Sequence, residues 1–287
     1  MNIHKNIYKP QKYGQTKSVA LFTNARDEKN IKEWAAHHLL IGFDKIIIFD
    51  HKSIIPLKDV FSNFDNRIKI IDAKKYESNV KLRLMNVAAK IAKGLRVDWF
   101  IYLDADEFLI LHNKFIGVKH FLNHYNNAHS LAVNWLFFGS NNHISDPEGL
   151  ILENYTKSST ILDKHIKSFV RPNEVINAIT PHFYSIQNKN RMFGINKILN
   201  DNIEPFSFNT TNMEYFNVPA YIAHYAWQSE ESYIRRKINL PTDDTGIFRN
   251  NDIENIHHNA NDNENLYPKN KYVENIKRFL ECKTQKI

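Results

Sequence analysis

The chain has 287 residues, of which 43% are hydrophobic, 13% aromatic and 24% charged. Disordered chains are poor in apolar and aromatic residues and richer in unbalanced charge, so this composition excludes them and predicts a globular protein. Lys and Arg number 38 against 31 Asp and Glu. The resulting formal net charge of +7 favours anionic partners such as phosphates, lipid headgroups or nucleic acid.

The single cysteine, Cys282, excludes an intrachain disulfide and a cysteine metal cluster, and it favours a reducing compartment. The beginning of the chain lacks the apolar stretch of a signal peptide. Apolar runs elsewhere fall far short of the roughly 20 residues that a membrane-spanning helix needs. We therefore expect a cytoplasmic protein, either free or held peripherally on a membrane surface.

Strands and helices are expected to alternate through the first hundred residues. Short apolar runs predict strands, and apolar residues at helical spacing predict helices that end near Gly42 and Gly94. This alternation is typical of an α/β fold with a doubly wound, mostly parallel, Rossmann-like sheet flanked by helices. The expected elements are strand 18–23, helix 27–41, strand 45–50, strand 67–72, helix 78–93 and strand 99–103.

After about residue 130 the pattern changes to strands separated by loops rich in Asn, Asp, Pro and Ser. No internal repeat and no Ser/Gly linker marks a domain boundary. We therefore expect a mixed α+β half that is laid onto the edge of the first sheet. Its predicted elements are strands 131–138, 165–170, 178–186 and 218–224 and helices 230–238 and 271–281.

Polar and acidic residues follow three of the predicted strands of the first half, at 23–28, 50–53 and 104–107. Ligands of open parallel sheets bind outside the carboxyl ends of the strands, so these three clusters are expected to meet at one crevice. In the third cluster Asp104, Asp106 and Glu107 come directly after the apolar run 99–103. Crowded buried acids need a compensating cation, and a hard divalent ion with oxygen ligands would provide it.

A series of segments runs in a fixed order through most of residues 18–250. They include 21–28 (LFTNARDE), 33–44 (EWAAHHLLIGFD), 47–53 (IIFDHKS), 103–109 (LDADEFL), 133–140 (VNWLFFGS), 167–172 (KSFVRP), 181–183 (PHF) and 223–233 (AHYAWQSEESY). In this series the chain resembles the family 2 glycosyltransferases and their relatives of family 92.

This resemblance implies a single domain of the GT-A fold over residues 18–250. It would have a nucleotide-binding half at 18–110 and an acceptor and metal-completing half at 111–250. An N-terminal extension (1–17) would precede this domain, and a C-terminal loop and helix (251–287) would follow it.

The resemblance also assigns roles to residues. Asp104 and Asp106 match the Asp-X-Asp pair that holds Mn²⁺ or Mg²⁺ against the diphosphate of a nucleotide sugar, and His224 matches a histidine that completes the metal shell. The positions that would contact the nucleotide are Thr23, Arg26, Glu28 and Asp50.

The charge and shape of the reactants suggest further candidate site residues. Cations must stabilise the charge that develops on a leaving diphosphate. Arg235, Arg236 and Lys237 follow His224 and would supply such charge, unless they form a solvated helix face. An aromatic residue beside small ones, as in Trp135, Gly139 and Ser140, is a candidate platform for the acceptor sugar.

Inverting transfer needs a general base, and a carboxylate is the usual choice. The candidates are Asp146, Glu148, Glu231, Asp243 and Asp244. Among them we favour Asp244, which lies in the loop 241–246, and keep Glu231 as the next candidate.

The leading interpretation is a metal-dependent, inverting glycosyltransferase of glycan biosynthesis. It would move a sugar from a nucleotide donor, UDP-hexose in our expectation, to a glycan or lipid-linked acceptor. One alternative is a Mg²⁺-dependent nucleotidyltransferase or phosphohydrolase, which would need a Gly-rich phosphate loop that 23–28 lacks. A second alternative is a non-enzymatic basic protein that binds nucleic acid or a membrane, but its Lys and Arg would form a stripe and here they are scattered.

Overall fold

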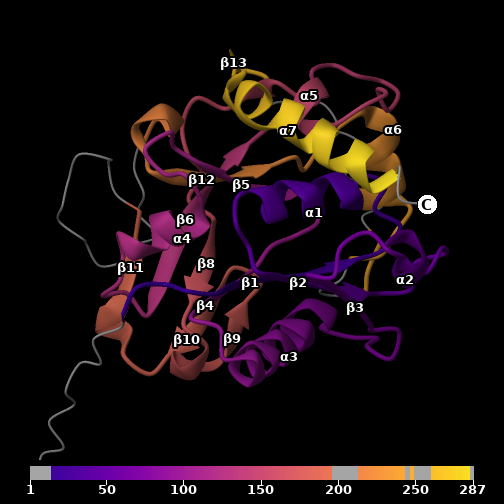
Figure 1. Ribbon diagram of the computed structural model, residues 1–287. Helices are drawn as coiled ribbons and strands as arrows, with labels where there is room; N and C mark the ends of the chain where they lie inside the picture. Colours follow the sequence, from indigo (N-terminus) through magenta and orange to yellow (C-terminus); the bar gives the residue numbers. More distant parts are fainter. Residues whose placement is uncertain (1–13, 196–212, 243–245, 249–259, 285–287) are drawn as a thin grey trace, which may run out of the picture.

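The structure is a computed structural model that describes residues 14–195, 213–242, 246–248 and 260–284 (Figure 1). Within these residues, nine strands form one sheet in the order β3-β2-β1-β4-β8-β6-β12-β5, with β11 paired to β6. Its strands are β1 (Val19–Ala25), β2 (Lys45–Asp50), β3 (Ile68–Asp72), β4 (Trp99–Tyr102), β5 (Glu107–Leu111), β6 (Ser130–Phe137), β8 (Ile166–Val170), β11 (Met192–Gly194) and β12 (Ala220–His224).

The first four strands run parallel to one another in the order β3-β2-β1-β4. These are the first four positions of the Rossmann strand order 3-2-1-4-5-6. Beyond β4 the sheet is mixed. Strand β8 is antiparallel to both β4 and β6, β12 is parallel to β6, and β5 is antiparallel to β12. The prediction of an α/β protein with a mostly parallel sheet and a mixed second half laid onto its edge is therefore confirmed.

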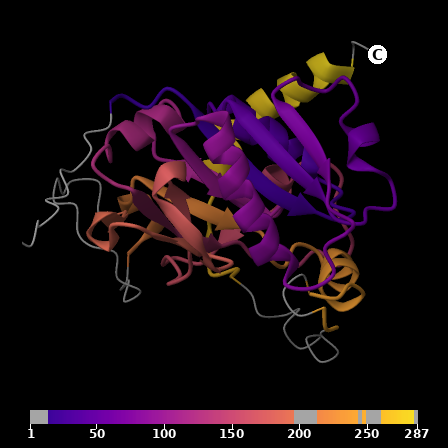
Figure 2. The same ribbon diagram turned by 90° about the horizontal axis from the view of Figure 1, so that it is seen from below.

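Helices cover both faces of the parallel strands. In Figure 1, α1 (Ile31–Leu40) and α7 (Tyr267–Thr284) lie above β1, β2 and β3, and α3 (Val80–Leu95) lies below them. Figure 2, seen from below, places α3 in front of the sheet and α7 behind it. Strands β1, β2 and β4 are buried on both faces for this reason, which explains why β2 is a nearly continuous apolar run.

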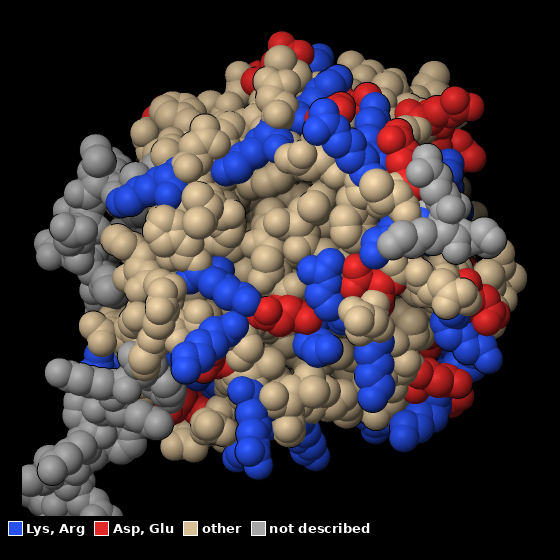
Figure 3. Space-filling view, viewed as in Figure 1, with Lys and Arg blue, Asp and Glu red and all other residues tan. Residues whose placement is uncertain are grey.

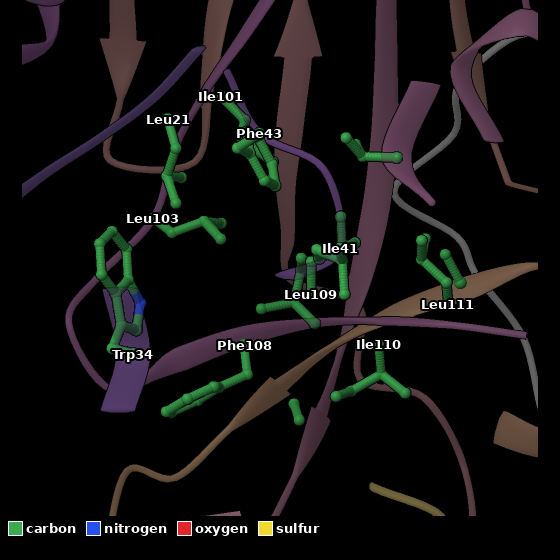
Figure 4. Packing of buried hydrophobic residues seen from close by; sticks show 14 of the residues in the cluster. Leu21, Trp34, Ile41, Phe43, Ile101, Leu103, Phe108, Leu109, Ile110 and Leu111 are labelled. Atoms are coloured by element: carbon green, nitrogen blue, oxygen red, sulfur yellow. The ribbon is translucent and has the colours of Figure 1, made fainter. Parts of the chain in front are cut away.

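The larger of two hydrophobic clusters lies between the sheet, α1 and α7. Figure 4 shows side chains from β1, from the end of β4, from α1 and from β5 packed together in it. Trp34 of α1 is fully buried, and its indole N–H donates a hydrogen bond of 2.8 Å to the carbonyl oxygen of Glu107. The bond fixes the start of β5, so the acidic segment 104–107 is held against a rigid helix.

Two predicted elements differ from the structure. The strand expected at 178–186 is a hairpin of β9 (Val175–Thr180) and β10 (Phe183–Ile186), because Pro181 lacks the N–H that a strand ladder requires. The helix expected at 230–238 is one α-helical turn, α6 (Glu230–Tyr233), followed by the π-helical segment η4 (Ile234–Ile238). Strand β5 was not expected from the sequence.

The remaining elements are short and connect these parts: α2 (Leu57–Val60), α4 (Val118–Asn123), α5 (Ile151–Asn154), η1 (Pro172–Glu174), η2 (Lys189–Arg191), η3 (Tyr215–Asn217), and β7 (Lys157–Ser158) paired with β13 (Asn263–Glu264). Among the described helices, none has both the length and the apolar character that crossing a bilayer requires.

Candidate functional site

The ends of β1 and β4 border a cavity of about 320 Å³. The β1 end contributes Arg26 and Glu28, and the segment after β4 contributes Asp104 and Asp106. Two of the three polar clusters predicted from the sequence therefore meet here. Residues 50–53, the third cluster, do not line this cavity.

Asp104 lies between two lysines that belong to different elements. Lys81 of α3 forms an ion pair with Asp104 Oδ1, and Lys167 of β8 places its Nζ 3.3 Å from Oδ2. Burial alone would raise the pKa of Asp104, but the ammonium groups of Lys167 and Lys81 outweigh it and hold this pKa below its ordinary value. Asp104 is therefore ionised at neutral pH.

Asp106 is paired with the basic segment that follows β12. Arg236 of η4 donates a hydrogen bond to Asp106 Oδ2, and the Nζ of Lys237 lies 3.7 Å from the same oxygen. Burial would raise the pKa of Asp106, but Lys237 and Arg236 hold it below its ordinary value. Arg236 also approaches Glu28 across the cavity, at 3.6 Å from Nε to Oε2.

Glu107 is fully buried next to these acids and contacts both the backbone of Asp104 and the lysine that Asp104 pairs with. Its Oε2 accepts a hydrogen bond of 2.9 Å from the backbone N–H of Asp104 and lies 3.3 Å from Lys167 Nζ. Burial, and then the charge of Asp104, raise the pKa of Glu107 to about 8. Lys167, only 1% exposed, thus bridges two carboxylates and is held in place beneath the cavity.

Two guanidinium groups that line the cavity retain hydrogen-bonding capacity. Arg26 Nε and Arg236 Nη1 are buried nitrogens without a hydrogen-bond partner in the part of the chain that the structure describes. A buried unpaired donor is costly, and an anion with several acceptor oxygens would satisfy both groups. Their placement favours a phosphate-bearing ligand in this cavity.

His224, the last residue of β12, faces Asp106 across 3.7 Å from Nε2 to Oδ1. Burial lowers the pKa of His224 to about 3, so the imidazole is neutral at pH 7. Its ring lies 4.3 Å from that of Trp135, which also lines the cavity. Phe137 stacks on the other side at 5.3 Å. This aromatic packing fixes the orientation of the imidazole.

The cavity brings together eight of the residues chosen from the sequence: Arg26, Glu28, Asp104, Asp106, Trp135, His224, Arg236 and Lys237. Thr23 is fully buried within β1 and Asp50 lies at the end of β2, and neither lines the cavity. Both carboxylate oxygens of Asp50 accept backbone hydrogen bonds, from Ser53 at 3.1 Å and from Leu57 at 2.9 Å.

The proposed base and acceptor residues are more dispersed. Glu231 accepts a hydrogen bond of 2.9 Å from the backbone N–H of Asp146 and lines a separate surface depression. Gly139 is packed so closely against Asn261 that an added Cβ would lie 2.1 Å from its Oδ1, and Ser140 Oγ accepts from a neighbouring backbone N–H. Neither of these two lines the cavity. Asp244 lies outside the described residues.

Three cavity residues with ionisable side chains had no role in the sequence interpretation: Lys81, Lys167 and His182. Lys167 and His182 belong to segments that carry the resemblance, but nothing local distinguishes them. A lysine inside an otherwise apolar strand is the one signal that the sequence offered, because β8 reads IKSFV and all five residues are buried.

Charges of both signs are spread over the visible surface. On the face shown in Figure 3, Lys and Arg alternate with Asp and Glu over much of the molecule. A nucleic-acid-binding protein would instead gather its basic residues into a stripe. Among the described residues, five Lys and Arg side chains line the cavity: Arg26, Lys81, Lys167, Arg236 and Lys237.

No protein-family model matches the chain, and no curated protein matches it in sequence. Solved structures with a partial likeness include HddC from Yersinia pseudotuberculosis, with a TM-score of 0.36 and 11% identity, covering 62% of this chain and 89% of that one. Another is a glycosyltransferase involved in the glycosylation of the major capsid of PBCV-1, with a TM-score of 0.26 and 14% identity, covering 55% of this chain and 61% of that one. A third is CMP:2-keto-3-deoxy-manno-octonic acid synthetase complexed with CTP, with a TM-score of 0.29 and 11% identity, covering 55% of this chain and 75% of that one. Likenesses this low do not define a family or an activity.

The chain is thus an α/β protein of Rossmann-like strand order with a charged cavity at the carboxyl ends of its parallel strands. Sites in such sheets lie at this edge. What the cavity binds has to be argued from its side chains.

Proposed function

We propose that the protein is a metal-dependent, inverting glycosyltransferase that moves a hexose from a nucleotide sugar such as a UDP-hexose to a glycan or lipid-linked acceptor. The observation that carries this proposal is the pairing of Asp104 and Asp106 with lysines and arginines around one cavity, together with unpartnered buried nitrogens of Arg26 and Arg236. Fixed cations and unused donors at a sheet edge suit a diphosphate.

The donor set of the cavity fits a divalent cation that binds together with the diphosphate. Among the described residues, no three His, Cys, Asp or Glu side chains converge as a complete metal centre. However, a carboxylate oxygen of Asp106 and the neutral Nε2 of His224, 3.7 Å apart, are within reach of one ion bound at about 2.0–2.2 Å from each. Mg²⁺ usually takes one or two protein ligands and completes its shell with phosphate oxygens and water.

Asp106 and His224, with Asp104 beside them, would hold such an ion. Its chemical contribution when bound would be to neutralise charge on the diphosphate. The lysine and arginine side chains of the cavity would also neutralise charge on the diphosphate, and the fold holds them in position. In this proposal Lys81, Arg236 and Lys237 exchange part of their contact with the acids for contact with the phosphate oxygens.

The remaining cavity residues suit the sugar. Trp135 is held by His224 on one side and by His165, stacked at 5.1 Å, on another. A rigid aromatic residue bordering the cavity offers an apolar face to a hexose ring at little entropic cost. We assign Trp135 to sugar binding in this proposal.

Thermal stability measured with UDP and Mn²⁺, separately and together, tests the proposal. We expect a joint rise in Tm that exceeds the sum of the separate effects, followed by release of UDP from one member of a panel of UDP-hexoses. Stabilisation by CTP with pyrophosphate release would instead indicate a nucleotidyltransferase, and stabilisation by DNA alone would indicate a nucleic-acid-binding protein. Either of these results would overturn the proposal.

A further inference from the structure

His182 lies at the rim of the cavity, in the two-residue turn between β9 and β10. The hairpin is anchored on α3, because Tyr184 OH donates to the carbonyl oxygen of Met85 at 3.1 Å and Asn86 Oδ1 accepts from the backbone N–H of Ala178 at 3.0 Å. A helix packed against the sheet thus sets the position of the turn. The β9–β10 hairpin and its contacts with α3 therefore hold the imidazole at the cavity.

A single hydrogen bond fixes the tautomer of His182. Its Nδ1 lies 3.2 Å from the carbonyl oxygen of Ile166. A carbonyl oxygen only accepts, so Nδ1 carries the hydrogen and Nε2 keeps a lone pair. Trp135 contacts the ring edge to face at 5.1 Å and limits its rotation. Nε2 is therefore the ring nitrogen left for a substrate.

The other side chains of the cavity that could accept a proton are paired with charged or polar partners. Among the described residues that line it, Asp104 and Asp106 are paired with lysines and an arginine, Glu28 faces Arg236, and His224 faces Asp106. Lysine and arginine partners hold the pKa of Asp104 and of Asp106 below its ordinary value, so these two carboxylates are weak proton acceptors. His182 is the one base of this lining without an ion-pair contact of this kind.

From this geometry we propose that His182 is the general base of the transfer reaction, a role that rests on the function proposed above. Nε2 takes the proton of the acceptor hydroxyl while its oxygen forms the bond to the anomeric carbon. The bond from that carbon to the phosphate oxygen breaks, and the nucleoside diphosphate leaves with the electron pair. The resulting imidazolium keeps its Nδ1–H bond to Ile166 and returns its extra proton to water.

Charges on three neighbouring elements act on this imidazole. Burial, then Lys167 of β8 and His165 before it, lower the pKa of His182, whereas Asp104 after β4 raises it, and the result is about 4. The group is therefore neutral, and competent as a base, at pH 7. Activity should fall as the pH drops toward this pKa, because protonation removes the lone pair on Nε2.

The test uses hydrolysis of the preferred UDP-hexose by the full chain, with water as the acceptor, between pH 4 and 9. His182→Asn keeps a donor near the place of Nδ1 and removes Nε2. We expect its kcat to fall by about 100-fold or more, the acid limb of its pH profile to disappear, and its affinity for UDP to stay within about twofold. His120→Asn is the matched control, since His120 is an exposed residue of α4 that does not line the cavity, and we expect a change below about threefold.

The outcomes separate the two proposals. A wild-type protein that neither binds UDP nor hydrolyses any UDP-hexose would defeat the proposed function and the base with it. Wild-type hydrolysis together with an unchanged kcat and pH profile in His182→Asn would overturn the base alone. An equal loss of UDP affinity and kcat would also overturn it, because it would indicate donor binding. If His182→Asn does not fold, His182→Gln replaces it. A wild-type profile without an acid limb would overturn the base even without a variant.

Discussion

Four acidic residues in the described part of the chain fall into two groups with different partners. Asp50 and Glu33 accept hydrogen bonds from backbone N–H groups, in the turn after β2 and at the start of α5. Asp104 and Asp106 are instead paired with lysine and arginine side chains from distant segments. In sequence, Asp50 and Asp104 look alike, since each follows an apolar strand.

The difference teaches how to separate structural acids from functional ones. Backbone N–H groups are fixed by the fold, so a carboxylate that they satisfy holds a loop in place. Side-chain cations can exchange one anion for another. The pairs around Asp104 and Asp106 can therefore open for a ligand, whereas the bonds of Asp50 cannot open without loss of the turn.

The largest effect is expected from Lys167→Met. It leaves the ionised Asp104 and the buried carboxyl group of Glu107 without their shared cation, and breaking a buried ion pair from one side typically costs about 3–5 kcal/mol. Urea unfolding would measure it. Lys69→Met, on the exposed face of β3, is the control and should change the free energy of unfolding by less than about 0.5 kcal/mol. Equal effects in both variants would refute the role of the buried bridge.

The matched pair Asp106→Asn and Asp50→Asn tests the comparison directly. Asp106→Asn should lower UDP-hexose hydrolysis by about 100-fold, which corresponds to about 2.7 kcal/mol, and abolish the joint effect of UDP and Mn²⁺ on Tm. Asp50→Asn should lower the free energy of unfolding by about 1–2 kcal/mol and leave UDP affinity within about threefold. If Asp50→Asn lost UDP affinity while remaining folded, Asp50 would belong to the nucleotide site, as its position in the sequence suggested.

The smallest effect is a dependence of stability on pH. Burial raises the pKa of Glu33 to about 7 from an ordinary value of 4.5. Between these values the folded protein holds a proton that the unfolded chain has released, so the contribution of Glu33 to stability is present at low pH and is lost as the pH rises through about 7.

Urea unfolding at several pH values between 4.5 and 8 would measure this dependence. We expect Glu33→Gln to flatten the decline by about 1 kcal/mol, whereas Glu148→Gln, at an exposed position, should preserve it. A decline of the same size in Glu33→Gln would exclude Glu33 as its source.

Local patterns predicted much of this fold. The first four strands of the parallel sheet and the helices α1 and α3 follow from apolar runs and helical spacing, and the place of Asp104 and Asp106 follows from a strand that ends in acids. Lys81 could not be assigned in this way. The residues around Lys81 predict only that it lies in an amphipathic helix. Its contact with Asp104 depends on how α3 crosses the sheet, which the local sequence does not encode.

The turn at His182 shows the same limit. Its role depends on β9 folding back over α3 and on one hydrogen bond to Ile166, and both are contacts between distant segments. The cavity was predictable where the ends of β1 and β4 supply it. It was not predictable where α3, β8 and the turn between β9 and β10 contribute Lys81, Lys167 and His182.

The helix α7 has a consequence for how the chain folds during translation. It buries Ile276 completely, accepts a hydrogen bond from the backbone N–H of Leu111 at the hydroxyl of Tyr272, and ties Lys283 to Asp65. The ribosome releases this helix after every other described element. The nascent sheet therefore exposes the surface beneath α7 until synthesis has passed it, and a chaperone that shields this surface would protect the chain in the interval.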